Sequence, residues 1–179
     1  LKRGDRLCQV RLARGESALT RTELAVRYHR TALCFDGARP LAEHELRFDA
    51  EGGILLRIGL EGREPCGWRA ALSTPVVDFA AQGAHAAEDF WEPLRAKGGH
   101  CVLEPGRFYL FASKERIRIP PDLAAEMLPV DVGIGELRNN YAGFFDSGFG
   151  WDEARAGGTP AVLEVRAHDV PFVVEPRDF

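Results

Sequence analysis

Short stretches of alternating apolar and polar residues, separated by turn residues, make up most of this chain. Alternation with a period of two predicts strands that bury one face. Helical periodicity is scarce: residues 19–30 fit one amphipathic helix, and residues 122–128 fit one or two helical turns with Asp122 as the N-cap. The predicted strands are 6–13, 32–35, 53–60, 101–113, 115–120 and two within 161–176 that join near residues 168–169.

Many short strands and few helices predict a mainly β fold, either a sandwich or a barrel, with one or two short helices. Turn signals at Asp36-Gly37 and Pro105-Gly106 separate predicted strands. The 179 residues suffice for one domain with a core, and 45% hydrophobic and 28% charged residues are typical of a globular protein. No apolar run is long enough to span a bilayer, so we expect no membrane association.

The net charge of −4 is unevenly distributed along the chain. Residues 1–30 contain eight Lys or Arg and three acidic residues, which leaves 15 basic and 24 acidic residues for the remainder. A basic segment could meet phosphates, but it could equally be a solvated linker or a strand edge protected by charge. No nucleic-acid-binding motif accompanies it, so we predict no nucleic-acid partner. The four cysteines form no CxxC pattern, which favours reduced thiols in a cytoplasmic protein.

The stretch NNYAGFFDSGFGWDE, residues 139–153, places five aromatic residues and three glycines around Asp146. An ordinary turn rarely contains so many rings, and a core strand excludes a carboxylate without partners. The mixture is typical of a loop that wraps a flat, polar ligand. The alternative is that Asp146 is a turn residue that accepts hydrogen bonds from nearby amides.

Glu164 lies within an apolar run, Ala161-Val162-Leu163-Glu164-Val165. A carboxylate on such a strand is expected to be partly desolvated, and this would raise its pKa toward a value useful for proton transfer. The alternative is a glutamate that faces outward between apolar neighbours, as on any half-buried strand.

Three motifs together resemble the deoxycytidine triphosphate deaminases of the dUTPase-like superfamily: IPPDL (119–123), AGFFDSGFG (142–150) and VLEV (162–165). The match is closest to the C-terminal half of the double-length bacterial form. The resemblance implies a distorted β-barrel, or β-clip, that forms trimers with sites at subunit boundaries. It also implies that residues 1–15 are a closing strand or linker from a preceding domain, and that residues 16–179 form the barrel.

The activity that the resemblance implies is hydrolysis of the 4-amino group of dCTP, giving dUTP and ammonia in pyrimidine deoxynucleotide synthesis. The family uses no catalytic metal, and magnesium accompanies the triphosphate. Glu164 matches the glutamate that takes a proton from water and delivers it to the base or the leaving amine. Asp146 matches the aspartate that binds the 3′-hydroxyl, while an aromatic neighbour blocks the 2′ face. The candidate substrate-binding residues are Asp146, Ala142, Tyr141, Phe145 and Arg138.

The sequence also departs from the family pattern. The usual pair of serines, followed by an arginine that helps to bind phosphate, has no counterpart in residues 127–140, where Arg138 is out of register. The gap between Asp146 and Glu164 is longer than usual. Three hypotheses therefore remain: a contributor to a deaminase site, a structural half without chemistry, or a domain that binds a deoxynucleotide without turnover. A dUTPase is a weaker alternative.

Overall fold

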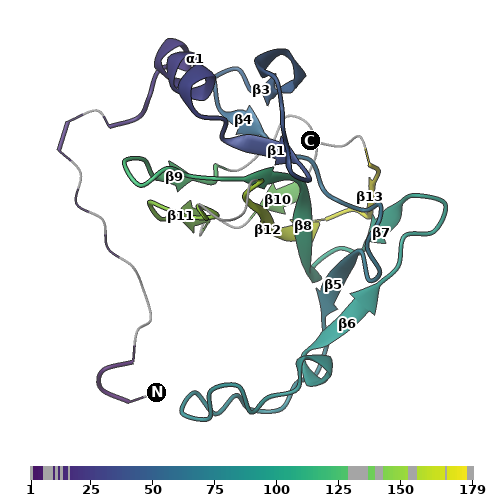
Figure 1. Ribbon diagram of the computed structural model, residues 1–179. Helices are drawn as coiled ribbons and strands as arrows, with labels where there is room; N and C mark the ends of the chain where they lie inside the picture. Colours follow the sequence, from purple (N-terminus) through teal and green to yellow (C-terminus); the bar gives the residue numbers. More distant parts are fainter. Residues whose placement is uncertain are drawn as a thin grey trace.

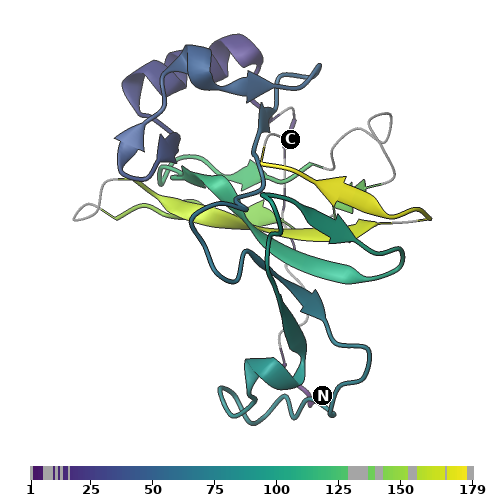
Figure 2. The ribbon, with the colours of Figure 1, turned by 90° about the vertical axis from the view of Figure 1, so that its right-hand side faces the viewer.

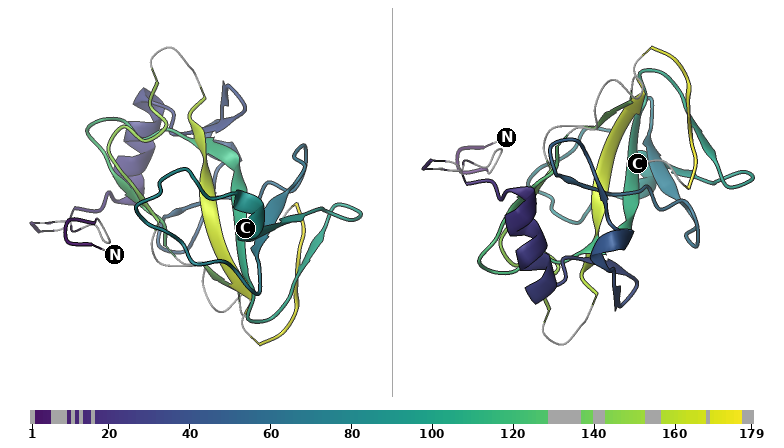
Figure 3. Two further views of the ribbon diagram at one scale, coloured as in Figure 1. Left: turned by 90° about the horizontal axis from the view of Figure 1, so that it is seen from below. Right: turned by 90° about the horizontal axis from the view of Figure 1, so that it is seen from above.

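The molecule is organised around one long strand, β8 (Phe108–Ile117), which lies at the centre of a seven-stranded sheet (Figure 1). The computed structural model describes residues 2–5, 10, 12, 14, 15, 17–128, 137–139 (backbone only), 143–152, 157–167 and 169–176. Strand β12 (Thr159–Ala167) pairs antiparallel with β8, and the two run side by side in both views of Figure 3. On its other edge, β8 pairs with β1 (Cys34–Asp36) at one end and β5 (Gly67–Ala70) at the other.

The rest of the sheet and three small two-stranded sheets complete the fold. Strands β2 and β10 close the two ends of the main sheet, and β6 pairs with β5 in an arm that leaves the body of the molecule (Figure 1). The small sheets pair β11 with β9, β13 with β7, and β3 with β4. Their bounds are β2 (Arg39–Pro40), β3 (Arg47–Phe48), β4 (Ile54–Leu55), β6 (Trp91–Leu94), β7 (Cys101–Leu103), β9 (Ala125–Glu126), β10 (Leu137–Asn139), β11 (Phe144–Phe145) and β13 (Phe172–Val174).

The helical content is one α-helix, α1 (Arg21–Arg30), and two short 3-10 turns, η1 (Glu43–Glu45) and η2 (Ala87–Asp89), among the described residues. Helix α1 lies above the sheet on the same side as β3 and β4 (Figure 2). Its start is specified locally, because Thr20 and Glu23 form a capping box: Glu23 N donates to Thr20 Oγ1 at 3.3 Å, and Thr20 N donates to Glu23 Oε2 at 2.8 Å.

The core lies on one face of the β8–β12 pair. Along β8 every second residue is buried, with Tyr109 and Phe111 at 0% and 2% exposure, and along β12 the buried positions include Ala161 and Val165. Directly opposite residues on paired strands share a face, so these side chains form one continuous apolar layer. The intervening residues of both strands form the outer face, which includes Glu164.

A break in the register near the middle of β8 is bridged by a buried serine. The pairing passes from Pro160 opposite Arg116 to Val162 opposite Ala112, so β8 contains two extra residues there. The Ser113 hydroxyl accepts a hydrogen bond from Ala161 N at 2.8 Å and donates to Glu115 O at 2.5 Å. Its side chain thus replaces a ladder bond that the bulge removes.

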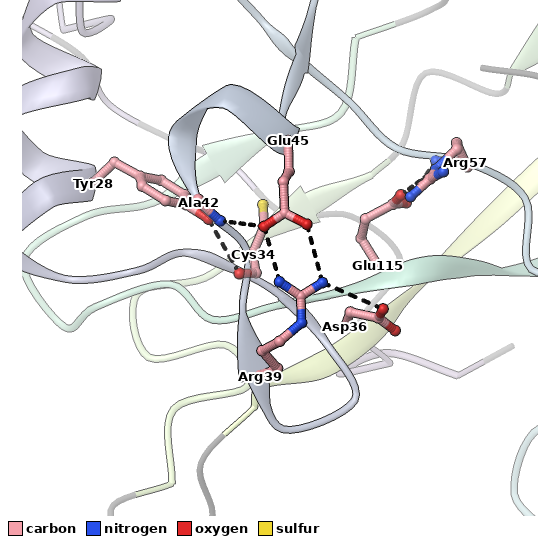
Figure 4. A network of polar contacts seen from close by, with 8 residues as sticks. All are labelled: Tyr28, Cys34, Asp36, Arg39, Ala42, Glu45, Arg57 and Glu115. Atoms are coloured by element: carbon pink, nitrogen blue, oxygen red, sulfur yellow. Dashed lines mark hydrogen bonds and ion pairs between the residues drawn. The ribbon is translucent and has the colours of Figure 1, made fainter.

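A network of polar contacts joins α1, β1 and η1 (Figure 4). The Tyr28 hydroxyl donates to the carbonyls of Leu41, at 2.8 Å, and Cys34, at 3.2 Å. Arg39 makes two parallel hydrogen bonds to Glu45, at 2.9 and 3.1 Å. That guanidinium, followed by the amide of Ala42, lowers the pKa of Glu45 to about 2.

A buried carboxylate on β8 is fully engaged within the same region. Glu115 is 6% exposed and accepts from Arg57 Nε at 2.6 Å and from Arg57 N at 2.7 Å (Figure 4). These two charge-assisted bonds offset the cost of burying the carboxylate. Glu115 therefore has a structural role: it attaches the segment near Arg57 to β8.

The mainly β fold with few helices is confirmed, and several predicted elements are found where expected. The helix at 19–30 is α1, the strand at 32–35 is β1 with its Gly37 turn, and 161–176 holds β12 and β13. The predicted strand 53–60 is reduced to β4 and one isolated bridge between Ile58 and Ser113.

Two predictions were wrong. Residues 122–128 form no helix, because Ala125–Glu126 is strand β9 and pairs with β11, while Asp122 forms an ion pair with Arg27 instead of a cap. The predicted turn at Pro105-Gly106 is confirmed, since β7 ends at Leu103 and β8 begins at Phe108, but the predicted break between residues 113 and 115 is wrong, because β8 runs without interruption to Ile117. The predicted strand at 6–13 lies mostly outside the described residues.

Candidate functional site

Glu164 lies in the middle of β12, on the face of the sheet opposite the core. Its cross-strand partner is Leu110 of β8, and both side chains are partly buried. Its outward neighbour Val162 is 60% exposed. On the other side of Leu110, Trp68 of β5 is its cross-strand partner and is also partly buried. Glu164 therefore stands beside a partly covered apolar surface, and its catalytic role stays a prediction.

The aromatic and glycine-rich loop is anchored at its base and exposed at Asp146. Strand β11 pairs with β9, so Phe145 lies opposite Ala125 and is 8% exposed. The Phe145 ring packs on Phe149, with ring centres 4.9 Å apart, whereas Asp146 is exposed. The loop thus fixes Asp146 on a rigid aromatic base.

Short turns carry the loop back to the end of β8. Phe149 N donates to Asp146 O at 2.9 Å, and Ile119 N donates to Phe149 O at 2.8 Å. Gly150 has a φ of +66°, and a Cβ at this position would lie 2.4 Å from the carbonyl oxygen of Ile117. Only glycine fits here without displacement, because both the backbone conformation and the close approach exclude a side chain.

The structure places Glu164 and the Asp146 loop at different points along the same pair of strands. The loop is held against Ile117 and Thr159, whereas Glu164 is five residues further along β12. At about 3.3 Å per residue, this separation is roughly 16 Å along the strand. This separation is measured from the anchor of the loop at Gly150, and Asp146 lies four residues before that anchor.

The other candidate residues are only partly placed. Arg138 is in β10, directly opposite Arg166 of β12, and the structure describes its backbone but not its side chain. Tyr141 and Ala142 lie outside the described residues. Phe145 has its ring in the core, so its proposed contact with a sugar stays a prediction, as does that of Asp146.

Tertiary structure also reveals pairs that sequence reasoning did not find. The thiols of Cys66 and Cys101, 35 residues apart in sequence, are 3.4 Å apart and buried. Burial, followed by the hydrogen bond from Cys66, raises the pKa of Cys101 to about 12. The guanidinium of Arg118 lies between the rings of Phe35 and Trp151, at 4.9 and 4.7 Å from their centres. No spacing rule in the sequence indicates either arrangement.

Neither a metal cluster nor a membrane-spanning helix is found in the part of the chain that the structure describes. No three His, Cys, Asp or Glu side chains gather there as metal ligands. No helix there is long and apolar enough to cross a membrane. A small cavity of about 30 Å³ lies between α1 and the turn at Pro120–Leu123, and none of the candidate residues lines it.

The fold defines a class of mainly β domain built on a curled sheet with one long central strand. Residues 28–178 match the family model for the C-terminal domain of 2′-deoxycytidine 5′-triphosphate deaminase. The chain belongs to this family of deaminase C-terminal domains. The resemblance recognised from the three motifs is thereby confirmed.

A solved relative agrees with the family match. The crystal structure of 2′-deoxycytidine 5′-triphosphate deaminase from Agrobacterium tumefaciens is similar, with a TM-score of 0.76 and 38% sequence identity. The similarity covers 90% of this chain and 45% of that chain, so this chain spans about half the length of the relative. A search of curated proteins found no match.

Proposed function

We propose that this chain forms half of a dCTP deaminase and contributes residues to hydrolysis of the 4-amino group of dCTP. The observation that carries the proposal is the match to the deaminase C-terminal domain over residues 28–178. The products are dUTP and ammonia, and the enzyme works in the cytoplasm on pyrimidine deoxynucleotides. Magnesium arrives with the triphosphate of the substrate and needs few protein ligands of its own.

Glu164 is the proposed proton carrier. It removes a proton from water as the oxygen bonds to C4 of cytosine, and it gives that proton to N3 as the ring accepts the electron pair. It then takes the proton of the new C4 hydroxyl and gives it to the amine, which leaves as ammonia as the C4 carbonyl forms. One carboxylate can perform both rounds, because each acceptance of a proton is followed by a donation that returns it to its starting state.

The proposed sugar site is Asp146, contributed by a different copy or half from the one that supplies Glu164. Support comes from the separation of roughly 16 Å between the loop anchor and Glu164, at about 3.3 Å per residue. Both groups are outside the core, Asp146 on an exposed loop and Glu164 on the outer sheet face. Assembly around a symmetry axis, as a trimer or a pseudo-trimer of unlike halves, would bring the two together.

A structural half without chemistry is the second candidate. The specific observation in its favour is that residues 127–140 contain no serine. If the usual water-positioning and phosphate-binding groups are missing here, the other half of the enzyme would hold the working site. The two candidates differ in whether Glu164 matters for turnover.

The test is ammonia release from dCTP with magnesium, measured on the native protein and its Glu164→Gln variant. We expect turnover to fall at least a hundredfold, because an amide cannot accept the proton of water. The matched control is Glu61→Gln, which removes one exposed carboxylate from a turn. Full activity of a folded Glu164→Gln protein would leave Glu164 as a strand residue and favour the structural half.

A further inference from the structure

Three cations project in succession from the outer face of β8 and its extension: Lys114, Arg116 and Arg118. The buried residues between them, Glu115 and Ile117, face the opposite side. We refer to these three residues as the cation row.

No member of the cation row forms an ion pair with a carboxylate among the described residues. In the described part of the chain, six other arginines form ion pairs with carboxylates, whereas no member of the row does. Three unneutralised positive charges on one strand repel one another, and an anion bound across them would relieve that repulsion. The six paired residues are Arg27, Arg39, Arg57, Arg69, Arg95 and Arg107.

Two members of the row are held in fixed positions. Arg116 donates from Nε to Gly157 O at 2.9 Å and from Nη2 to Gly158 O at 2.6 Å. Arg118 is clamped between the rings of Phe35 and Trp151. A guanidinium fixed in this way loses little conformational freedom on binding an anion, which favours recognition over a freely moving surface charge.

Arg118 also carries an unsatisfied donor. Its Nε is buried and donates no hydrogen bond, although buried polar groups almost always have partners. The cation–π contacts with Phe35 and Trp151 satisfy none of the N–H groups of the guanidinium. Because Nε is covered, a bound anion would contact this guanidinium at its terminal nitrogens.

The row adjoins the anchor of the Asp146 loop. Trp151, which covers Arg118, follows the loop directly, and Trp151 N donates to Gly148 O at 3.0 Å. Gly150 lies against Ile117, between Arg116 and Arg118. The loop that carries Asp146 therefore ends beside this end of β8.

We propose that Lys114, Arg116 and Arg118 form a polyphosphate-binding row that takes the triphosphate of the nucleotide whose sugar meets Asp146. The identity of that nucleotide rests on the proposed function, whereas binding of a polyphosphate does not. Residues 127–140 contain no serine that could bind phosphate, and the cation row would supply such contacts in its place. Its charge suits a highly anionic ligand, and the stacked Arg118 provides a planar donor for phosphate oxygens.

The test is calorimetric titration of the full chain with inorganic tripolyphosphate, orthophosphate, deoxycytidine and dCTP at low ionic strength. We expect tripolyphosphate and dCTP to bind, and deoxycytidine to bind at least tenfold more weakly than dCTP. Lys114→Gln and Arg118→Met should each weaken tripolyphosphate binding at least threefold. Lys114 is exposed, so its variant tests the row without disturbing the fold. Lys97→Gln, an equal loss of charge in a hairpin away from the row, is the control and should bind normally.

The outcomes separate this inference from the proposed function. The proposed polyphosphate site is wrong if tripolyphosphate does not bind to the native protein. It is also wrong if Lys114→Gln and Arg118→Met both bind tripolyphosphate as tightly as the native protein does. If tripolyphosphate binding depends on the cation row but the native protein does not turn over dCTP, the polyphosphate site is supported and the deaminase activity is contradicted. If both variants turn over dCTP with an unchanged KM, the deaminase activity is supported and the polyphosphate site is contradicted.

Discussion

Glu164 of β12 lies directly opposite Leu110 of β8, while the loop that carries Asp146 is held seven residues further along β8, at Ile117. The two carboxylates proposed to serve one substrate are thus attached to separate points of one rigid strand pair. The proposal that the site is shared between copies rests on this separation of the loop anchor from Glu164.

Mixing two inactive variants tests whether the site is shared. Glu164→Gln and Asp146→Asn should each abolish dCTP turnover alone, because each removes one half of every site. When the two are co-expressed in equal amounts and assemble at random, about a quarter of shared sites contain both native carboxylates. We therefore expect ammonia release to recover to about a quarter of the native rate. Co-expression without recovery, with mixed oligomers confirmed by mass spectrometry, would place both residues in one chain's site.

The close packing of Gly158 on β8 predicts a strong effect of a single methyl group. Gly158 has a φ of +59°, and a Cβ there would lie 2.2 Å from the Ile117 carbonyl oxygen. We expect Gly158→Ala to lower the free energy of unfolding by about 3 kcal/mol, because backbone strain and a clash add together. Urea denaturation measures the change.

Gly106→Ala is the matched control for that substitution. Gly106 has a φ of +72°, but a Cβ would meet nothing within 4 Å, so only backbone strain remains. The expected loss is about 1 kcal/mol. Equal losses at the two positions would show that the approach to Ile117 is unimportant.

Tyr28 is expected to contribute to stability through its hydroxyl as well as its ring. The hydroxyl is buried and donates to the carbonyls of Leu41 and Cys34. Tyr28→Phe keeps the ring and leaves those carbonyls with less hydrogen bonding, at a cost of about 1 to 2 kcal/mol. Chemical denaturation of the variant gives this value. An unchanged midpoint would mean that water or a small shift replaces the lost bonds.

Alkaline pH should destabilise the fold through Cys34. Burial, followed by the nearby Glu115, raises the pKa of the Cys34 thiol from 9.0 to about 12. The unfolded chain loses this proton first, so the stabilising contribution is complete below pH 9 and is lost as the pH rises toward about 12.

Cys34→Ala isolates that contribution from the other titrating groups. The variant is less stable near pH 8 because it loses buried apolar volume. The difference in free energy of unfolding between the native protein and the variant should shrink by roughly 2 kcal/mol by about pH 10.5. Only the native protein loses stability there, because its unfolded state releases the Cys34 proton while its folded state retains it. Parallel curves for the two proteins from pH 8 to 10.5 would contradict the raised pKa.

Local chemistry made several features of this protein readable in the sequence alone. Helix α1 was predictable because Thr20 and Glu23 cap it within four residues. The β1–β2 turn followed from Asp36-Gly37, where Gly37 takes a φ of +61°. The family was recognised from three short motifs, since loop composition and strand alternation are properties of contiguous residues.

Contacts between distant segments decided the rest. Residues 122–128 have helical composition, but a segment this short has little helical stability of its own, and pairing of β9 with β11 prevails. Three arrangements depend on how β8 meets its neighbours: the approach of Cys66 to Cys101, the contacts of Arg118 with Phe35 and Trp151, and the separation of Glu164 from the anchor of the Asp146 loop. Pattern within a strand specifies which face is buried, whereas register and bulges between strands set which side chains meet, and only the folded sheet determines those.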